Sequence, residues 1–258
     1  MSKMSITLTP LPGIPLISPG DDIASLILLA IEQAGLKLVD NDILVVAQKI
    51  ISKAEGQLVN LGSVTPSPRA RELAVQIEKD ARFVELILRE SAEVLRTRPG
   101  TIIVEHRLGF VCANAGIDHS NVRGEGTLTG EWVLLLPENP DASARILRQR
   151  LEAATGACLG VLIIDSHGRA WRMGIAGVAI GLSGVPGLVD LRGQPDLFRY
   201  TLRITQVGAA DELASAASLA MGQAAEGTPV VHVRGFPYPL RESSLAELLR
   251  PRDQDLFR

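Results

Sequence analysis

Three short runs of consecutive apolar residues constrain the fold of this chain most. They lie at residues 43–46, 160–164 and 229–233, and each is rich in valine, leucine or isoleucine. Apolar runs of this length, bounded by turn-forming residues, predict buried β-strands. Helical patterns separate them, but without the regular strand–helix alternation of a doubly wound sheet. The sequence therefore predicts an α+β protein with a mixed sheet.

The clearest helix is expected at residues 23–34, with an apolar stripe, Asp21 as its N-cap and Gly35 as its stop. Ser67 and Pro68 open a helical region expected to run, with interruptions, to about Arg96. Further strands are predicted at 5–8, 101–105, 108–112, 132–136 and 202–207, the second and third joined as a hairpin through His106 and Arg107. Further helices are predicted after Asp141 and Asp211, which would cap them, and a short one at 244–247 from its capping-box pattern.

Composition narrows the class of protein. The 258 residues suit one large domain or two small ones sharing a core, and 46% hydrophobic residues predict a sizeable interior. A net charge of −3 gives no reason to expect nucleic-acid or membrane binding, so any anionic substrate needs a local cluster of positive groups. Cys112 and Cys158 each lie in an apolar run and are expected to be buried free thiols, which suits a cytoplasmic protein.

Neither the N-terminus nor the apolar segment 174–191 has the pattern of a targeting or membrane signal. The N-terminus lacks the long apolar core of a signal peptide. Residues 174–191 are apolar, but glycines, a serine and Pro186 interrupt them, which predicts buried, tightly turned backbone instead of a membrane span. We therefore expect a soluble, cytoplasmic protein with no membrane and no nucleic-acid partner.

The first segment with candidate chemistry is residues 48–56, directly after a buried strand. Lys49 and Lys53, with Ser52 and Gly56, can present ammonium groups and backbone N–H donors to phosphates. The spacing of a P-loop is absent. The alternative to a phosphate-binding role is that both are ordinary surface lysines at the end of a strand.

The next two segments each follow a predicted strand. Asp118 and Asn121 come after the strand that ends at Cys112, and Asp165 and Ser166 come after the run 160–164. Two aspartates at two strand ends can hold divalent cations that bridge nucleotide phosphates, and such hard oxygen ligands suit Mg²⁺ or Mn²⁺, not zinc. An Asx-turn that only shapes the loop is the alternative for the first segment. The four histidines, His106, His119, His167 and His232, have no spacing typical of metal ligands.

The fourth segment is the glycine-bounded stretch 221–229, which follows an amphipathic helix. It would lie against a purine or a phosphate, or simply connect a helix to a strand.

Together these segments resemble one family, the coenzyme F-420-0:L-glutamate ligases. The matching motifs occur in the family's order over nearly the whole chain: residues 12–17, 19–22, 51–56, 114–118, 120–122, 165–169, 179–181, 210–212 and 233–235. Bifunctional relatives carry an additional flavin-binding domain after the ligase part. We expect residues 1–258 to be one γ-glutamyl ligase domain without it.

The resemblance implies a set of site residues. Those expected to contact GTP are Ile14, Pro15, Leu16, Ile17, Gln48, Lys49, Lys53, Asn121, Met221, Gly222, Gln223, Ala224, Ala225, Glu226, Gly227 and Thr228. Asp118 and Asp165 would hold one divalent cation, Mg²⁺ or Mn²⁺, while Ser166 and Gln223 would belong to a second. Lys53, Asp118 and Asp165 would be the catalytic residues. The family also implies potassium and an intertwined homodimer.

The implied reaction follows from the chemistry of carboxylates. A carboxylate is a poor acyl donor, so GTP would first phosphorylate the phospholactyl carboxylate of the precursor. The amino group of L-glutamate would then attack the acyl phosphate, and further rounds would add γ-linked glutamates. Positioning and charge neutralisation by the metals and Lys53 would supply the catalysis.

Two departures from the family and two rival functions remain open at this point. Gln48 stands where members often have serine or threonine, and Gln223 where the archaeal type has glutamate. The second metal site and the tail length are therefore the features most affected. The rivals are a catalytically silent GTP- and metal-binding regulator on the same fold, and a ligase for another precursor acid.

Overall fold

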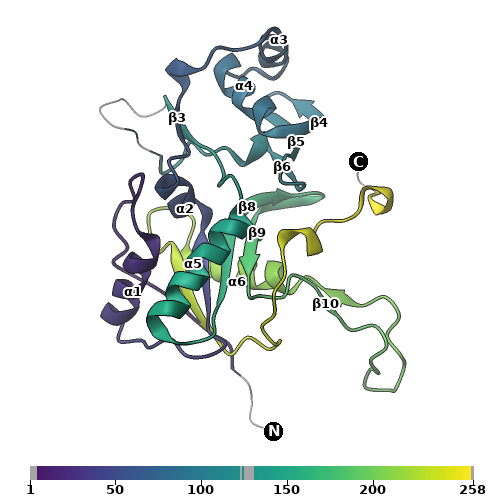
Figure 1. Cartoon of the computed structure of the whole chain (residues 1–258). Helices are drawn as coiled ribbons and strands as arrows, with labels where there is room; N and C mark the ends of the chain where they lie inside the picture. Colours follow the sequence, from purple (N-terminus) through teal and green to yellow (C-terminus); the bar gives the residue numbers. More distant parts are fainter. Residues whose placement is uncertain (1–4, 123, 125–130, 257–258) are drawn as a thin grey trace.

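The chain folds into two lobes, described by a computed structural model over residues 5–122, 124 and 131–256. The lower lobe in Figure 1 contains a five-stranded sheet with helices packed on it, and the upper lobe contains two further helices and a three-stranded sheet. The predicted α+β class with a mixed sheet is confirmed. No helix in the described part of the chain has both the length and the apolar character needed to cross a bilayer.

The large sheet has the strand order β1-β12-β2-β8-β9. Its strands are β1 (Thr7–Pro10), β12 (Val230–Arg234), β2 (Ile43–Ala47), β8 (Gly160–Arg169) and β9 (Arg172–Ser183). Only β2 and β8 pair in parallel, which makes the sheet mixed. The three apolar runs of the sequence form its three central strands, as predicted.

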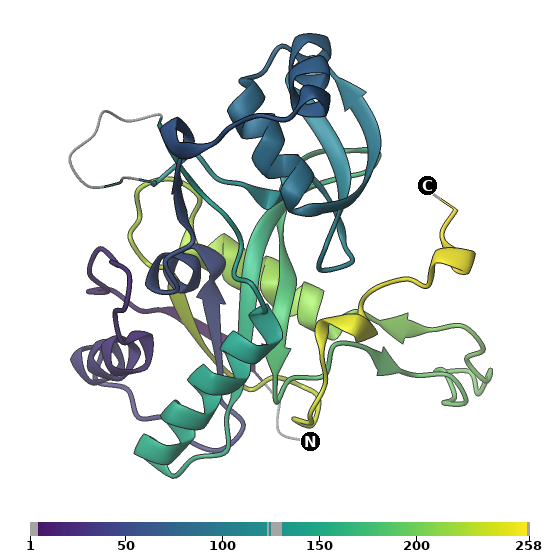
Figure 2. The same ribbon diagram turned by 45° about the horizontal axis from the view of Figure 1, so that its top comes forward.

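Helices cover both faces of this sheet, as the two views in Figures 1 and 2 show. Helices α1 (Ile23–Gln33) and α5 (Pro140–Thr155) share one apolar core with Leu44 and Val46 of β2, while α6 (Ala209–Met221) shares another with Ile43 and Val45. Since successive side chains of β2 face opposite cores, every position of the strand has to be apolar.

Two glycines of β9 bring the helices close to the sheet. A Cβ atom at Gly177 would lie 2.5 Å from the Ala214 carbonyl oxygen of α6, and one at Gly181 would lie 2.4 Å from Pro140 of α5. Between them lies a β-bulge: Ile163 is opposite Gly181, but Ile164 is opposite Ala179, so Ile180 is an extra residue in β9.

The β8–β9 hairpin is longer than the sequence analysis predicted. Strand β8 does not end before Asp165 but continues to Arg169, and residues 172–183 form one strand instead of tightly turned backbone. The prediction that residues 174–191 are buried holds for most of the stretch but fails at its start, where Gly174 and Ile175 are exposed. The reason is that β8 and β9 stabilise each other as a hairpin beyond the edge of the helical layers.

The upper lobe contains α3 (Pro68–Ile77), α4 (Ala81–Arg89) and the sheet β4 (Ser91–Arg98), β5 (Thr101–His106) and β6 (Val111–Ala113). The helix predicted to reach Arg96 is wrong in its last part. Glu78, with φ of 57°, ends α3, and residues from Ser91 onward pair with β5. The predicted β5–β6 hairpin is confirmed, but its turn is residues 107–110. Strands β3 (Leu58–Asn60) and β7 (Trp132–Leu134) pair beside the lobe.

The helix caps differ from the predictions by one to three residues, the largest difference being at α6, whose N-cap is Gly208 instead of Asp211. Asp22, not Asp21, caps α1 by accepting a hydrogen bond from Ser25 N, and Asn139 caps α5. Asp141 and Asp211 lie inside the first turns of α5 and α6. Their carboxylates accept hydrogen bonds from the backbone of Leu182 and Ala179, so they tie both helices to β9.

The remaining elements are short. They are α2 (Gln48–Ala54), the 3₁₀ turns η1 (Leu61–Ser63), η2 (Asn114–Gly116), η3 (Leu245–Glu247) and η4 (Arg252–Gln254), and the strands β10 (Val189–Asp190) and β11 (Gln206–Val207). The strand predicted at 202–207 is therefore only two residues long, and Ser244 makes no side-chain cap for η3. Cys112 is buried as expected, but Cys158 is exposed in the loop after α5.

Candidate active site

One cavity of about 1150 Å³ brings together all four polar segments singled out in the sequence. Its walls come from the loop before α1, from α2, from the segment around Asp118, from the middle of β8 and from the loop after α6. In Figure 1 the helix α2 lies between the two lobes, beside β8. The segments are up to about two hundred residues apart in the chain, and only the folded sheet makes them neighbours.

Helix α2 supplies the positive charge of this cavity. It starts directly after β2, and its residues Lys49 and Lys53 lie one turn apart on the side that lines the cavity. Lys49 forms an ion pair with Asp118, and Lys53 Nζ donates a hydrogen bond of 2.8 Å to the carbonyl oxygen of Asn121. Burial and the neighbouring charge of Lys49 lower the pKa of Lys53. Both lysines therefore line the cavity with their ammonium groups engaged by the Asp118 segment.

Asp118 projects from the segment that follows η2. Its backbone is fixed by a pair of hydrogen bonds with Leu134, each 3.0 Å long. Its carboxylate contacts Lys49 and accepts a hydrogen bond of 2.6 Å from Gln48 Nε2. Burial raises the pKa of Asp118 above its usual range, despite the lowering effect of Lys49, and the charge of Asp165 raises it further.

Asp165 lies within strand β8, not beyond its end, which corrects the prediction that both aspartates follow strands. Its Oδ2 is 3.0 Å from Nε2 of His167, two residues along the same strand face. Burial raises the pKa of Asp165, but the hydrogen bond and charge of His167, with the charge of Lys49, outweigh it and lower the pKa below its usual range. The ring of His167 also packs against Phe110, with centroids 5.2 Å apart.

Ser166 points to the opposite face of β8 from Asp165, toward the loop after α6. Its hydroxyl donates a hydrogen bond of 2.9 Å to Gln223 Oε1, and Gln223 Nε2 donates one of 2.7 Å to Ser218 Oγ. The predicted pair of Ser166 and Gln223 therefore lies together in the structure.

The loop from Met221 to Thr228 folds back on itself. It turns at Gly222, whose φ is 77°, and Glu226 Oε2 accepts a hydrogen bond of 2.8 Å from Ala224 N. This and other backbone hydrogen bonds lower the pKa of Glu226. Asn121 Nδ2 donates a hydrogen bond of 3.2 Å to the Ala224 carbonyl, so this loop and the Asp118 segment face each other across the cavity.

The donors present fit a hard divalent cation. Asp118 and Asp165 both line the cavity and are close enough for the charge of one to change the pKa of the other. The Ser166 hydroxyl and the Gln223 side-chain carbonyl line the same cavity, and carboxylate, hydroxyl and carbonyl oxygens are ligands of Mg²⁺ or Mn²⁺. Within residues 5–122, 124 and 131–256 no group of three His, Cys, Asp or Glu side chains has metal-binding geometry. A cation here would therefore take its further ligands from water, from neutral oxygens such as that of Ser166, or from substrate phosphates.

Three of the histidines and Cys112 have contacts that do not involve the two cavity aspartates. His106 stacks on Phe110, His119 packs against Phe83, and His232 lies 2.9 Å from Asp42. Burial raises the pKa of the Cys112 thiol to about 12, so it is not a nucleophile at neutral pH.

Sequence reasoning did not identify α2 as a helix, nor the supporting roles of Ser52, His167 and Ser218. A signal for the helix was present, because the spacing of Ala47, Ile50, Ile51 and Ala54 is that of an apolar helical face. That helix would have placed Gln48 and Ser52 on one side. No local signal in the sequence connects Ser218 to Gln223.

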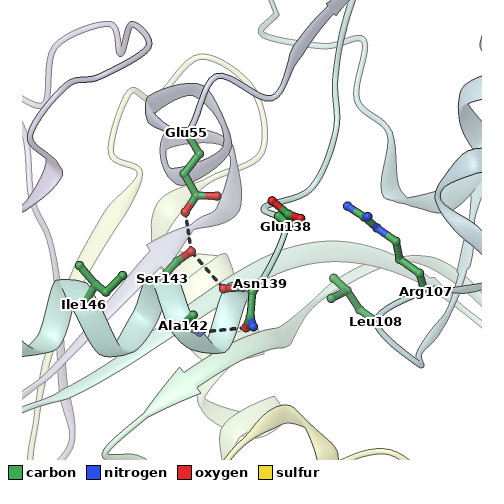
Figure 3. Close-up of a pocket in the computed structure, with 8 residues that line it drawn as sticks. All are labelled: Glu55, Arg107, Leu108, Glu138, Asn139, Ala142, Ser143 and Ile146. Carbon is green, nitrogen blue, oxygen red and sulfur yellow. Dashed lines mark hydrogen bonds between the residues drawn. The ribbon is translucent and has the colours of Figure 1, made fainter.

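A second, shallower cavity of about 590 Å³ lies between the end of α2, the start of α5 and the β5–β6 turn (Figure 3). It was not predicted. Ser143 of α5 donates a hydrogen bond to Glu55 at the end of α2, and Arg107 and Glu138 lie across from them. The Glu55–Ser143 contact fixes the end of α2 against α5, and so helps to orient the helix that carries Lys49 and Lys53.

Comparison with known proteins gives consistent matches over almost the whole chain. The sequence profile of a family described as F420-0:Gamma-glutamyl ligase matches residues 13–235. A protein named coenzyme F420:L-glutamate ligase from Methanothermobacter thermautotrophicus is 47% identical, covering 99% of this chain and 100% of the relative. Proteins of the same name from Methanopyrus kandleri and Archaeoglobus fulgidus are 45% and 43% identical, over 98% and 99% of this chain and 98% and 97% of their own lengths.

Proposed function

The chain belongs to the F420-0:gamma-glutamyl ligase family, and from this premise we propose that it joins L-glutamate to coenzyme F420-0 in a GTP-driven, metal-assisted reaction. One observation carries the proposal beyond the family: two lysines and two aspartates from distant segments line a single cavity. Phosphoryl transfer to a carboxylate needs positive charge at the phosphates and carboxylates to hold a cation, and this cavity has both.

We propose that the nucleotide lies between the loop at Ile14–Ile17, helix α2 and the loop from Met221 to Thr228. Lys49 and Lys53 would neutralise the phosphates, and Asn121, already hydrogen-bonded to both Lys53 and Ala224, would close the site around them. A bound Mg²⁺ or Mn²⁺ would neutralise charge on the transferred phosphoryl group. Asp118 and Asp165 would hold it, with Ser166 and Gln223 beside a second ion. Potassium is proposed on the family resemblance alone.

In the proposed reaction, a carboxylate oxygen of the precursor attacks the γ-phosphorus of GTP, and GDP leaves with the bridging oxygen. The amino group of L-glutamate then attacks the acyl carbon, loses a proton, and expels inorganic phosphate. Lys53 would stay paired with phosphate oxygens throughout, because its position on α2 is fixed one turn from Lys49. No protein nucleophile takes part, which agrees with the high pKa of Cys112.

The test is to incubate the purified protein with coenzyme F420-0, GTP, Mn²⁺ and L-glutamate, and to follow product masses and phosphate release. Glutamate-dependent mass increments of one glutamyl residue support the proposal, and the number of increments gives the tail length. GDP binding without any product would favour a catalytically silent regulator. Product only with a precursor that carries another acid would change the proposed substrate.

We also propose a homodimer formed through the β10–β11 arm, acting in the cytoplasm where GTP is available. The arm is a hairpin that projects from the lower lobe (Figures 1 and 2). Its residues Leu197, Phe198 and Ile204 are 97%, 91% and 87% exposed, and such an apolar group is typical of a contact surface. A second copy of the chain is the proposed partner, since the family resemblance implies an intertwined dimer. A mass near the 27.6 kDa monomer in light scattering would overturn this.

A further inference from the structure

Gln48 is a polar residue inside the site whose two amide ends are both in use. Its side chain is almost fully buried, with the residue 1% exposed. Nε2 donates a hydrogen bond of 2.6 Å to Asp118 Oδ2, and Oε1 accepts one of 2.8 Å from the Ser52 hydroxyl. Ser52 is fully buried and lies one turn further along α2. A buried amide bonded at both ends has a single orientation.

The chemistry of the partners sets this orientation. An ionised carboxylate can only accept hydrogen bonds, so the NH₂ group of Gln48 has to face Asp118. The carbonyl end then faces Ser52, whose hydroxyl donates to it. We propose that Gln48 is a positioning residue which, oriented by Ser52, holds the Asp118 carboxylate for the divalent cation, instead of contacting the nucleotide. The inference rests on the metal assignment of the proposed function.

Asp118 needs such a support because only its side chain is free to turn. The backbone of Asp118 is fixed by its two hydrogen bonds to Leu134. The other group on the carboxylate is Lys49, which contacts the same oxygen, Oδ2. The Lys49 ammonium also lines the cavity in which the phosphates are proposed to lie, so phosphate oxygens compete for it. When Lys49 turns to a phosphate, Gln48 remains on Oδ2 and leaves Oδ1 to face the cation.

The test is direct Mn²⁺ binding, read from the electron paramagnetic resonance signal of the free ion, which does not depend on turnover. Gln48→Met keeps the side-chain length but removes both hydrogen bonds, and it should weaken Mn²⁺ binding about tenfold or more, the usual effect of losing an outer contact to a metal ligand. Ser52→Ala should weaken it less. The double variant should match Gln48→Met, because Ser52 acts through Gln48. GDP affinity in the absence of metal should stay unchanged.

Gln76→Met, on the exposed side of α3, is the matched control and should bind Mn²⁺ like the wild type. Thermal unfolding shows whether each variant is folded. If Gln48→Met does not fold, Ser52→Ala, which removes only one hydroxyl, decides the question by its own Mn²⁺ affinity.

Three results would overturn the inference. The first is unchanged or tighter Mn²⁺ binding with weaker GDP binding, which makes Gln48 a nucleotide contact. The second is additive losses in the double variant, which separates Ser52 from Gln48. The third is a wild-type protein that binds no Mn²⁺ in the presence of GDP, which removes the metal from the proposed function as well. The first two leave the proposed function standing.

Discussion

The two aspartates that line the cavity are held in different ways. Asp165 lies in the middle of β8, directly after the residues paired with β2 and opposite Val178 of β9, and its pKa is lowered, because the effect of His167 and Lys49 outweighs that of burial. Asp118 lies outside the large sheet, its backbone held by a pair of hydrogen bonds to Leu134, and burial raises its pKa. The surroundings of Asp165 thus favour its charged form, whereas burial works against the charged form of Asp118 despite its contact with Lys49.

The two sides of the cavity therefore differ in how their charge is held. On the β8 side, Asp165 has its partner His167 in the same strand. On the α2 side, Asp118 shares Lys49 with the phosphates in the proposed function. We expect this difference to appear in the variants below.

Asp165→Asn and Asp118→Asn should each reduce ligation by at least about a hundredfold, because either loss removes a carboxylate that the cation and phosphates require. Product formation at limiting Mn²⁺ measures this. Asp253→Asn, at an exposed position near the C-terminus, is the matched control and should be as active as the wild type. Near-normal turnover of either site variant would show that the cation is held elsewhere.

Lys53→Ala should weaken GDP binding about ten- to a hundredfold, since a charged hydrogen bond to phosphate contributes roughly 1.5–3 kcal/mol. Calorimetric titration measures the affinity directly. Lys37→Ala, at an exposed lysine in the loop after α1 that does not line the cavity, provides the comparison and should leave the affinity unchanged. An unaltered affinity in Lys53→Ala would return Lys53 to the surface-lysine interpretation.

The two asparagine variants should differ in sign when the free energy of unfolding is measured in urea with a chelator present. A lowered pKa in the folded state means that ionised Asp165 stabilises the fold above its unfolded pKa, and this contribution is lost as pH falls through the folded pKa. Asp165→Asn should therefore cost about 1–2 kcal/mol at neutral pH and little at strongly acidic pH.

Asp118 has a raised pKa, so its protonated form stabilises the fold at low pH, and this contribution is lost as pH rises through the folded pKa. Asp118→Asn should accordingly be no less stable than the wild type at neutral pH. Equal destabilisation by both variants at neutral pH would mean that the two carboxylates are held alike, and the comparison would fail.

The smallest expected effect is in the loop after α6. Gln223 lies against Ser166 but brings no negative charge, whereas Glu226 is folded back onto Ala224 N. Gln223→Glu should lower the Mn²⁺ concentration for half-maximal activity a fewfold, because a carboxylate offsets the charge of the ion. Glu226→Gln should be nearly silent in the same titration. The reverse pattern would assign the carboxylate role to Glu226.

Sequence patterns predicted the parts of the fold that depend on burial. The three central strands and the α1 stripe are confirmed because an element covered by a core has to be apolar at regular positions. The strand predicted for β8 ended too early, because β8 continues through Asp165, Ser166 and His167, and such polar residues are typical of a loop. Residues 91–96 were predicted as helical, because the pairing of β4 with β5 is a tertiary contact with no local signal.

The sequence predicted which segments form the candidate site, but not which side chains contact one another within it. Asp118, Asp165, Lys49 and Lys53 were each identified, and the structure brings all four to one cavity. Their partners come from elsewhere in the chain or depend on secondary structure that was not foreseen. Ser52 reaches Gln48 only because residues 48–54 are helical, and Ser218 reaches Gln223 only across the turn at Gly222.

The bulge at Ile180 limits which changes in length strand β9 can accept. Because β9 holds one extra residue there, Gly177 lies opposite Ser166, where α6 approaches, while Gly181 lies opposite Ile163, where α5 approaches. Without the bulge, a regular ladder continuing from the pair Ile163–Gly181 would put Val178 opposite Ser166 and press its side chain against α6. Deleting Ile180 keeps Gly177 opposite Ser166, but inserting a further residue between Gly177 and Gly181 moves one glycine away from its helix. Insertions in β9 should therefore be far more harmful than insertions in the β10–β11 arm, although β9 contributes few residues to the cavity. An insertion scan scored for soluble, GDP-binding protein should show an intolerant window from Gly177 to Gly181.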